Sequence, residues 1–181
     1  FEVLIIDDGS TDGTAAIVKK YLTSEFHLRY LYHKNRGLPL SRNVGILASA
    51  GKFITFLDSD DEYLPNHLEI RKNIICENPD TDFIYGNVKV IGDPYVPDMN
   101  DLSKFVNIDD CIVGGSFFIR KELADSLNGF KNLEYADDSE FFSRVAESNA
   151  NIFKCENRTY IYHRELEDSM TFKYQKNNEK I

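Results

Sequence analysis

The sequence is poor in cysteine, in basic charge and in long apolar runs. Only three cysteines occur among the 181 residues, at Cys76, Cys111 and Cys155. Their odd number and wide spacing match neither a disulfide framework nor a zinc-binding pattern. We therefore expect three free thiols and a reducing, cytoplasmic location. The inner face of a membrane is the alternative location for a longer form of the protein.

The shortage of basic residues excludes further classes of function. Lys and Arg number 21 against 30 Asp and Glu, which gives a formal net charge of −9. This balance argues against nonspecific nucleic-acid binding and against adhesion to anionic lipid. The longest apolar runs are far too short to span a bilayer, and no signal peptide is visible. The length fits one domain with a substantial core.

Acidic residues are concentrated directly after an apolar run. Residues 53–57 have the pattern of a short buried strand, and Asp58-Ser59-Asp60-Asp61 follow at once. Like charges crowded at one sheet edge are unfavourable unless a cation lies among them. In an extended chain Asp58 and Asp60 point the same way, which would suit Mg²⁺ or Mn²⁺ holding a diphosphate. The alternative is an acidic turn that caps the next helix.

The beginning of the sequence has the same design. Val3 to Ile6 is an apolar, β-branched run, and Asp7-Asp8-Gly9-Ser10 then turns the chain. Binding sites of open α/β sheets lie outside the carboxyl ends of the strands, so two strands with acidic ends predict one shared crevice. Ordinary turn chemistry is the alternative for Asp7-Asp8-Gly9.

Strand and helix patterns alternate along the chain, which predicts an α/β protein with a mainly parallel sheet flanked by helices. The expected strands are 3–6, 28–32, 53–57, 82–90, 116–120 and 157–163. The expected helices are 14–22, 39–50, 65–77, 121–127 and 138–148, with Gly51 as a C-cap. Segment 91–107 is expected to be a loop, and the polar tail 173–181 has little to bury.

Several short segments, in this order and spacing, resemble family 2 glycosyltransferases of the GT-A fold. They are Asp7-Asp8-Gly9-Ser10-Thr11-Asp12, Asn35-Arg36-Gly37, Ser41-Arg42-Asn43-Val44-Gly45, Ala50-Gly51-Lys52-Phe53-Ile54, Leu57-Asp58-Ser59-Asp60-Asp61, Asn128-Gly129-Phe130 and Asp137-Asp138-Ser139-Glu140. The resemblance implies one GT-A domain over residues 1–172. In that family a βα unit precedes the strand that ends in Asp-Asp-Gly-Ser. We therefore expect this chain to lack a first βα unit of about 30 residues or fewer.

The resemblance implies inverting transfer of a sugar from a nucleotide-diphosphate sugar to the hydroxyl of a glycan or lipid-linked acceptor. Asp138 matches the catalytic base that takes the proton of that hydroxyl. The family usually has Glu-Asp there, and Asp137 replaces the Glu in this chain. A helix N-cap is the alternative role for Asp138. Gly114-Gly115 matches the border of the acceptor pocket, and segment 91–107 is expected to help select the acceptor.

The same resemblance assigns the donor site. Asp60 would bind Mn²⁺ or Mg²⁺ directly, and Asp58 would contact the ribose or the metal through water. Asp8 would accept a hydrogen bond from the uracil ring, which favours UDP without excluding GDP or dTDP. Arg42 would pair with a phosphate or with the acidic cluster, or else brace Asp8 or Asp58. His163 matches a residue that touches metal or diphosphate in the family.

Three other functions remain open at this level. A non-catalytic nucleotide-sugar-binding module would keep the donor residues and lack transfer activity. A nucleotidyltransferase would need basic residues beside its first glycines, and Gly9 and Gly13 lack them. A phosphatase of the haloacid dehalogenase type would need an Asp-x-Asp after its first strand, where this chain has Asp7-Asp8.

Overall fold

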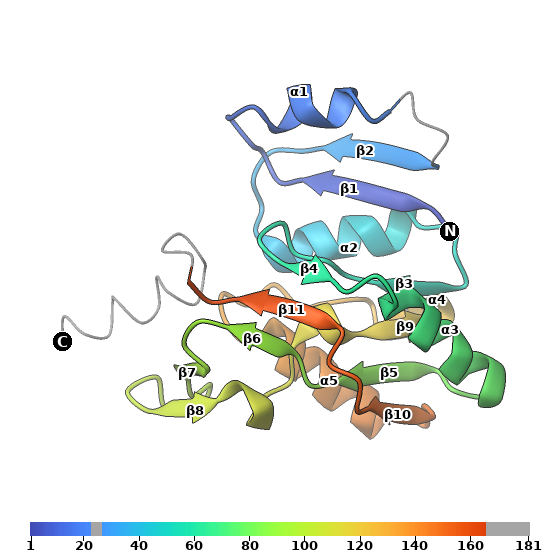
Figure 1. Cartoon of the computed structure of the whole chain (residues 1–181), viewed down its shortest axis with the longest axis vertical. Coiled ribbons are helices and arrows are strands. Elements are labelled where there is room, and N and C mark those ends of the chain that lie inside the picture. Colours follow the sequence, from blue (N-terminus) through green and yellow to red (C-terminus); the bar gives the residue numbers. More distant parts are fainter. Residues whose placement is uncertain (23–26, 166–181) are drawn as a thin grey trace.

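The computed structural model describes residues 1–22 and 27–165, and it begins with alternating strands and helices (Figure 1). These elements are β1 (Val3–Asp7), α1 (Thr14–Lys19), β2 (Leu28–Tyr32) and α2 (Leu38–Ala48). The two strands pair in parallel, with Val3 opposite Leu28 and Asp7 opposite Tyr32. Figure 1 shows α1 beside β2 and α2 beside β1. The carboxyl end of β1 therefore carries the first acidic pair, as the sequence predicts.

The rest of the described chain forms mixed sheets with three further α-helices. In chain order the elements are β3 (Phe53–Thr55), β4 (Glu62–Tyr63), α3 (His67–Glu77), β5 (Phe83–Gly86), β6 (Lys89–Ile91), β7 (Tyr95–Pro97), β8 (Phe105–Asn107), η1 (Ile108–Asp110), η2 (Gly114–Ser116), β9 (Phe118–Arg120), α4 (Lys121–Ser126), α5 (Asp137–Glu147), β10 (Ile152–Cys155) and β11 (Tyr160–His163). The α/β class is as expected from the alternating pattern. The tail 173–181 lies outside the described residues.

The strand directions are mixed, which differs from the expected mainly parallel sheet. The largest sheet has the order β10-β5-β9-β3, in which β10 is parallel to β5 while β9 runs antiparallel to both β5 and β3. The chain enters β9 from a hairpin and two 3-10 turns with no crossover helix, so β9 runs in the opposite direction. A second sheet has the order β4-β11-β6 and contacts the acidic segment after β3, because Asp61 hydrogen-bonds to Tyr160 and His163 of β11.

Several expected boundaries are wrong for identifiable reasons. The predicted strand 82–90 divides into β5 and β6, which belong to different sheets. The predicted loop 91–107 contains the antiparallel hairpin β7–β8, because Val96 and Val106 pair and face the core although a proline lies in β7. Strands β4 and β10 were not predicted, since each is short and lacks clear alternation. Helix α2 ends at Ser49 in extended conformation, so Gly51 is not its C-cap.

The main core is aromatic and joins both halves of the chain. Its buried members are Ile46, Ile54, Phe56, Phe83, Phe117, Ile119, Ala124, Phe130, Phe141 and Val145. Phe130 stacks on Phe141 with ring centroids 4.3 Å apart and meets the edge of Phe56 at 5.4 Å. Aromatic pairs at these separations stabilise beyond their buried area. This packing fixes α5 against β3, so it also fixes the acidic residues at the ends of both elements.

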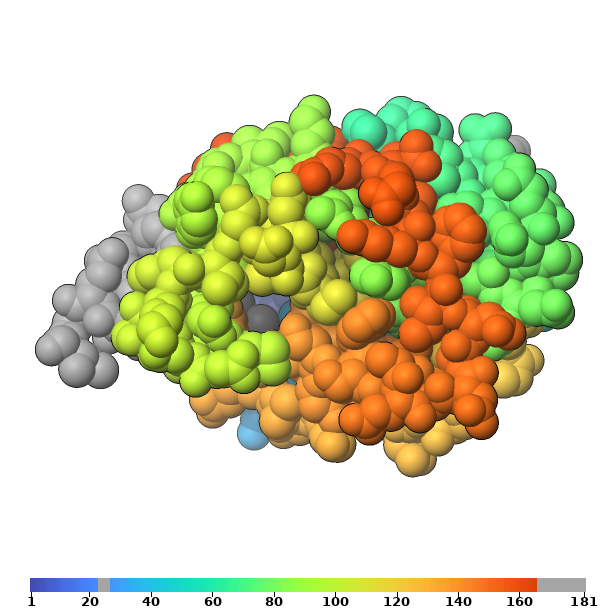
Figure 2. Space-filling model, turned by 90° about the horizontal axis from the view of Figure 1, so that it is seen from below, coloured from blue at the N-terminus to red at the C-terminus, as the bar shows by residue number. Residues whose placement is uncertain are grey.

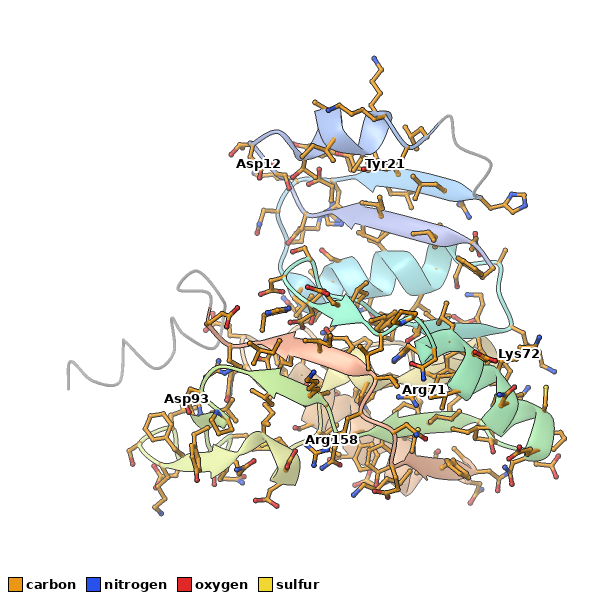
Figure 3. The ribbon with its side chains drawn as sticks, in the orientation of Figure 1. Asp12, Tyr21, Arg71, Lys72, Asp93 and Arg158 are labelled. Atoms are coloured by element: carbon orange, nitrogen blue, oxygen red, sulfur yellow. The ribbon has the colours of Figure 1, made fainter. Side chains whose placement is uncertain are left out.

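Helix α3 is anchored by buried residues to which the sequence patterns assigned no function. His67 is fully buried, stacks on Tyr63 at 3.8 Å between ring centroids, and lies 2.8 Å from the Thr159 hydroxyl through Nδ1. Burial lowers the pKa of His67 to about 4, so the ring is neutral. Figure 3 shows Arg71 inside the molecule and its neighbour Lys72 on the outside of α3. Within the described ranges, no helix is long and apolar enough to cross a membrane.

We predict that one cysteine thiol of the native protein reacts rapidly with a thiol reagent. All three cysteines are free, with Cys76 exposed, Cys111 half-buried and Cys155 buried. Burial raises the pKa of Cys111 to about 11, which leaves almost no thiolate at neutral pH. Titration with a thiol reagent should count one group rapidly in native protein and three after unfolding without reductant. A count of one after unfolding would reveal a disulfide and contradict the prediction.

Candidate functional site

The acidic segment after β3 is a tight turn rather than an extended strand end. Strand β3 stops at Thr55, and the Asp61 amide donates to the Asp58 carbonyl oxygen at 3.1 Å. Asp58 and Asp60 therefore do not point the same way by strand alternation, and that expectation is wrong.

Asp61 attaches this turn to β11. Its carboxylate accepts the Tyr160 hydroxyl at 2.5 Å and the His163 amide at 2.8 Å. Burial raises the pKa of Asp61 to about 6. Helix α3 begins at His67, so Asp61 is not at a helix N-terminus and the helix-cap alternative is wrong for it. Asp61 instead holds the acidic turn in place.

Arg42 lies at the centre of the site and joins two acidic segments. Its side chain is buried, with Nη2 3.1 Å from Asp58 Oδ2 and Nη1 3.0 Å from Asp137 Oδ2. The guanidinium also lies over Phe130 at 5.3 Å and Phe56 at 5.9 Å from the ring centroids. Nearby carboxylates raise the pKa of Arg42 against the opposing effect of burial. The structure thus shows Arg42 bracing Asp58, the alternative role named for it, while a phosphate contact stays a prediction.

The N-terminus of α5 presents two carboxylates to the interior. Ala136, which precedes α5, is left-handed at φ 56°, an unusual conformation for a residue with a Cβ. Asp138 lies inside the first turn and accepts the Ser139 amide at 2.8 Å and the Gly114 amide at 3.0 Å. It is therefore not the N-cap. Burial raises the pKa of Asp138, and it raises that of Asp137 to about 6.

Gly114 lies so close to Arg42 and Asp138 that a residue with a side chain would not fit at this position. A Cβ at this position would lie 2.9 Å from Arg42 Nη1 and 3.1 Å from the Cβ of Asp138. Such contacts would displace one of these two groups. The glycine motif that the sequence assigned to the acceptor border therefore also positions Asp138 and Arg42.

Asp8, which follows β1, organises the loop between β2 and α2. Its Oδ1 accepts the Arg36 amide at 2.7 Å and its Oδ2 accepts the Gly37 amide at 2.8 Å. His33 Nδ1 lies 3.3 Å from the same carboxylate. The Gly37 amide uses one of the two lone pairs of Oδ2, and a contact between Asp8 and the nucleotide base stays a prediction.

His163 lies beside the acidic turn but faces other carboxylates. Nε2 is 3.2 Å from Glu62 and Nδ1 is 3.5 Å from Glu165. Among residues 1–22 and 27–165 no three His, Cys, Asp or Glu side chains cluster as a ready-made metal site. Magnesium and manganese that bind with a diphosphate need only one or two protein carboxylates, so the acidic turn fits such an ion. Metal binding by Asp60, Asp58 and His163 stays a prediction.

The structure thus brings together Asp58, Arg42 and Asp138, which lie far apart in the sequence. Asp58 adds to the burial that raises the pKa of Asp138, so the two carboxylates are within electrostatic reach. The residues that sequence reasoning missed are the supporting ones, Tyr160 and Ala136. Neither carries a sequence signal, because each acts only through a distant partner or through its backbone conformation.

The family comparison supports the resemblance noted in the sequence. A model described as "Glycosyl transferase family 2" matches residues 1–133. YibD of Escherichia coli (strain K12), described as an uncharacterized glycosyltransferase, is 39% identical over 77 residues, which cover 42% of this chain and 22% of that protein. Glycosyltransferase GlyA of Streptococcus pneumoniae serotype 4 is 29% identical over 145 residues, covering 80% of this chain and 19% of that protein. The chain therefore spans less than a quarter of either relative.

Solved structures share the fold. TarS 1-349 from S. aureus, in complex with UDP-GlcNAc, matches with a TM-score of 0.74 at 24% identity, covering 94% of this chain and 51% of that one. The mannosyltransferase PcManGT from Pyrobaculum calidifontis, in complex with GDP-Man and Mn²⁺, matches with a TM-score of 0.66 at 18% identity, covering 88% and 47%. These likenesses confirm the expected GT-A type of α/β fold.

Proposed function

The chain belongs to glycosyltransferase family 2, and we propose that it carries the donor-binding and catalytic residues of an inverting, metal-dependent transferase. The donor is a nucleotide-diphosphate sugar, with UDP favoured, and the acceptor is a hydroxyl of a glycan or lipid-linked glycan. One observation carries the proposal. Arg42 bridges Asp58 of the donor side and Asp137 beside the proposed base, across 79 residues of sequence (137 − 58).

The proposed base has the environment that its role requires. Asp138 is held by two backbone amides, so its carboxylate has a fixed orientation. Burial raises its pKa, which makes it a stronger base than an exposed carboxylate. As the acceptor oxygen bonds to the anomeric carbon, Asp138 takes its proton, the bond to the diphosphate breaks and the nucleoside diphosphate leaves. Attack from the face opposite the leaving group inverts the anomeric carbon.

Donor binding is assigned to the acidic turn and to the loop held by Asp8. Asp60 is the direct carboxylate for Mn²⁺ or Mg²⁺, and Asp58 is the second. When bound, such a cation neutralises the charge that develops on the leaving diphosphate. Asp58 pairs with Arg42 at 3.1 Å, so its contact with the ribose or the metal would run through water. The fold relatives TarS and PcManGT are in complex with UDP-GlcNAc and with GDP-Man, and Asp8 would suit the ring N–H of either base.

We predict that UDP binding depends on a divalent cation and on Asp60. Without a cation the acidic turn repels a diphosphate, so EDTA should weaken UDP binding by about tenfold or more, or about 1.4 kcal/mol. Asp60→Asn should give a similar loss with Mn²⁺ present, because the amide keeps the shape and removes the charge. Calorimetric titration measures both effects.

Asp125→Asn is the matched control for this experiment. Asp125 is an exposed carboxylate of α4 that pairs with Lys121, away from the acidic turn. Its variant should bind UDP as the unaltered chain does. Equal UDP affinity in Mn²⁺ and in EDTA would refute the metal assignment, and normal binding by Asp60→Asn would make Asp60 a turn residue only.

A non-catalytic nucleotide-sugar-binding module is the second candidate. Such a module would share the donor residues but would have no use for an oriented, half-buried carboxylate at the start of α5. The observation that favours the enzyme is therefore the pair of amide hydrogen bonds to Asp138. Release of UDP from UDP-sugar in the presence of acceptor separates the two, since a binding module would release none.

A further inference from the structure

The acidic turn that carries Asp60 is closed by one buried hydroxyl group. Tyr160 of β11 is only 1% exposed, and its hydroxyl donates to Asp61 Oδ2 at 2.5 Å. The same oxygen accepts the Asp58 amide in a long contact of 3.5 Å. The Tyr160 hydroxyl therefore contacts both ends of the turn Asp58-Ser59-Asp60-Asp61, and Asp60 lies between these two contacts.

The Tyr160 ring has little freedom to move. The backbone of Gly115 lies against it, since a Cβ at that position would be 2.2 Å from the ring and 2.4 Å from the hydroxyl oxygen. Across the sheet Tyr160 pairs with Tyr63 of β4, and the two rings meet edge-on at 5.7 Å between centroids. Tyr63 in turn stacks on the fully buried His67. A hydroxyl group on a ring packed this closely has a fixed position, so the turn that it contacts is held as well.

Tyr160 does not belong to the motifs that assigned the donor site. It follows the last of them, Asp137-Asp138-Ser139-Glu140, and the family model matches residues 1–133. Its contacts suit an indirect role, because they fix the backbone on either side of Asp60 and need no contact with a cation. Removing such an outer partner of a metal ligand typically weakens metal binding by about 10–100-fold.

We propose that Tyr160 is a positioning residue of the donor site, whose hydroxyl holds the acidic turn in the conformation in which Asp60 binds the cation of a nucleotide diphosphate. This inference rests on the proposed function. Without the hydroxyl, the Asp61 carboxylate retains the His163 amide but loses its shorter hydrogen bond, and the Asp58 amide loses the oxygen to which it donates. Binding a cation would then have to order the turn, and affinity falls by the fraction of molecules that are not already ordered.

The test is Tyr160→Phe, which removes the hydroxyl and keeps the ring that packs on Gly115 and Tyr63. Calorimetric titration of the whole chain with UDP, in Mn²⁺ and in EDTA, measures how much the cation strengthens binding. The unaltered chain should gain about tenfold or more from Mn²⁺, and Tyr160→Phe should lose most of this gain while its affinity in EDTA stays the same. A general loosening of the structure would instead weaken UDP binding in both solutions.

Tyr135→Phe is the matched control. The Tyr135 hydroxyl donates to the Pro97 carbonyl at 2.7 Å, so this variant also removes one tyrosine hydroxyl that donates to an oxygen atom. Tyr135 lines a cavity of about 510 Å³ between the β7–β8 hairpin and α5, and Figure 2 shows this face of the molecule hollowed between these two elements. Tyr135→Phe should keep the full gain from Mn²⁺. Thermal unfolding verifies that both variants fold.

Amide hydrogen exchange gives a second readout that needs no ligand. The Asp61 amide donates to the Asp58 carbonyl oxygen at 3.1 Å within the turn. Tyr160→Phe should speed exchange of this amide by about tenfold or more, because a hydrogen bond to a charged carboxylate is lost. The amides of β9, in the centre of the main sheet, should keep their exchange rates.

Loss of the gain from Mn²⁺ in Tyr160→Phe, together with faster exchange at Asp61, supports the proposal. An unchanged gain in Tyr160→Phe, an equal loss in Tyr135→Phe, or unchanged exchange at Asp61 overturns it. The two proposals fail separately. An unaltered chain that gains nothing from Mn²⁺ would contradict the proposed metal-dependent donor site, and the exchange rate at Asp61 would still decide whether Tyr160 holds the turn.

Discussion

Asp138→Asn should lower kcat for sugar transfer by about 10²–10⁴-fold and leave UDP affinity nearly unchanged. The amide is nearly isosteric and can still accept the amides of Ser139 and Gly114, but it cannot take the acceptor proton. General-base catalysis typically contributes a factor of this size, and a group used only in the transition state affects kcat rather than binding. Steady-state kinetics with UDP-sugar measures the change in kcat, and calorimetric titration with UDP measures the change in affinity.

The neighbouring carboxylate provides the control. Asp137→Asn removes the adjacent, buried carboxylate charge, which faces Arg42, and keeps the base. It should reduce turnover far less than Asp138→Asn does. If Asp138→Asn keeps normal turnover, Asp138 is a structural residue and Asp137 becomes the next candidate. If it loses UDP binding instead, Asp138 belongs to the donor site and the inverting mechanism loses its main support.

Arg42→Met should destabilise the fold by about 3–5 kcal/mol. Methionine fills similar space against Phe56 and Phe130, so the loss comes mainly from electrostatics. Removing the guanidinium leaves Asp58 and Asp137 without their partner, and an uncompensated buried charge costs about this much. Urea unfolding at pH 8 measures the change. Arg158→Met is the matched control, because Arg158 holds Asp109 with two hydrogen bonds at the exposed surface, where such pairs contribute about 1 kcal/mol or less.

The loss caused by Arg42→Met should shrink on acidification. Burial already raises the pKa of Asp137 from 3.8 to about 6 while Arg42 opposes that shift, so removing Arg42 raises it further. A carboxyl group with a raised pKa in the folded state destabilises progressively as pH rises from its unfolded value through its folded value. The deficit should therefore be smaller at pH 5 than at pH 8. An equal deficit at both pH values would mean that packing rather than charge explains it.

Much of the site could be predicted from the sequence because its residues are at the ends of recognisable elements. Acidic residues that follow continuous apolar runs place Asp8 and Asp58 just beyond the carboxyl ends of β1 and β3, since short apolar runs of this kind predict buried strands. The segment before Asp138 lacks such a run, yet the start of α5 was predicted to within one residue. The family motifs supplied the roles, which local patterns do not encode.

The sequence by itself thus determined the α/β class, the positions of the acidic segments and the absence of cysteine pairs, because these depend on local patterns and composition. Only the tertiary structure decided which carboxylates meet. Arg42 could have braced Asp8 or Asp58, and it braces Asp58 and Asp137 because the aromatic core fixes α5 against β3. The hairpin within segment 91–107 and the cavity that it forms with α5 were likewise decided by long-range packing, since two short strands gain stability only from partners distant in the chain.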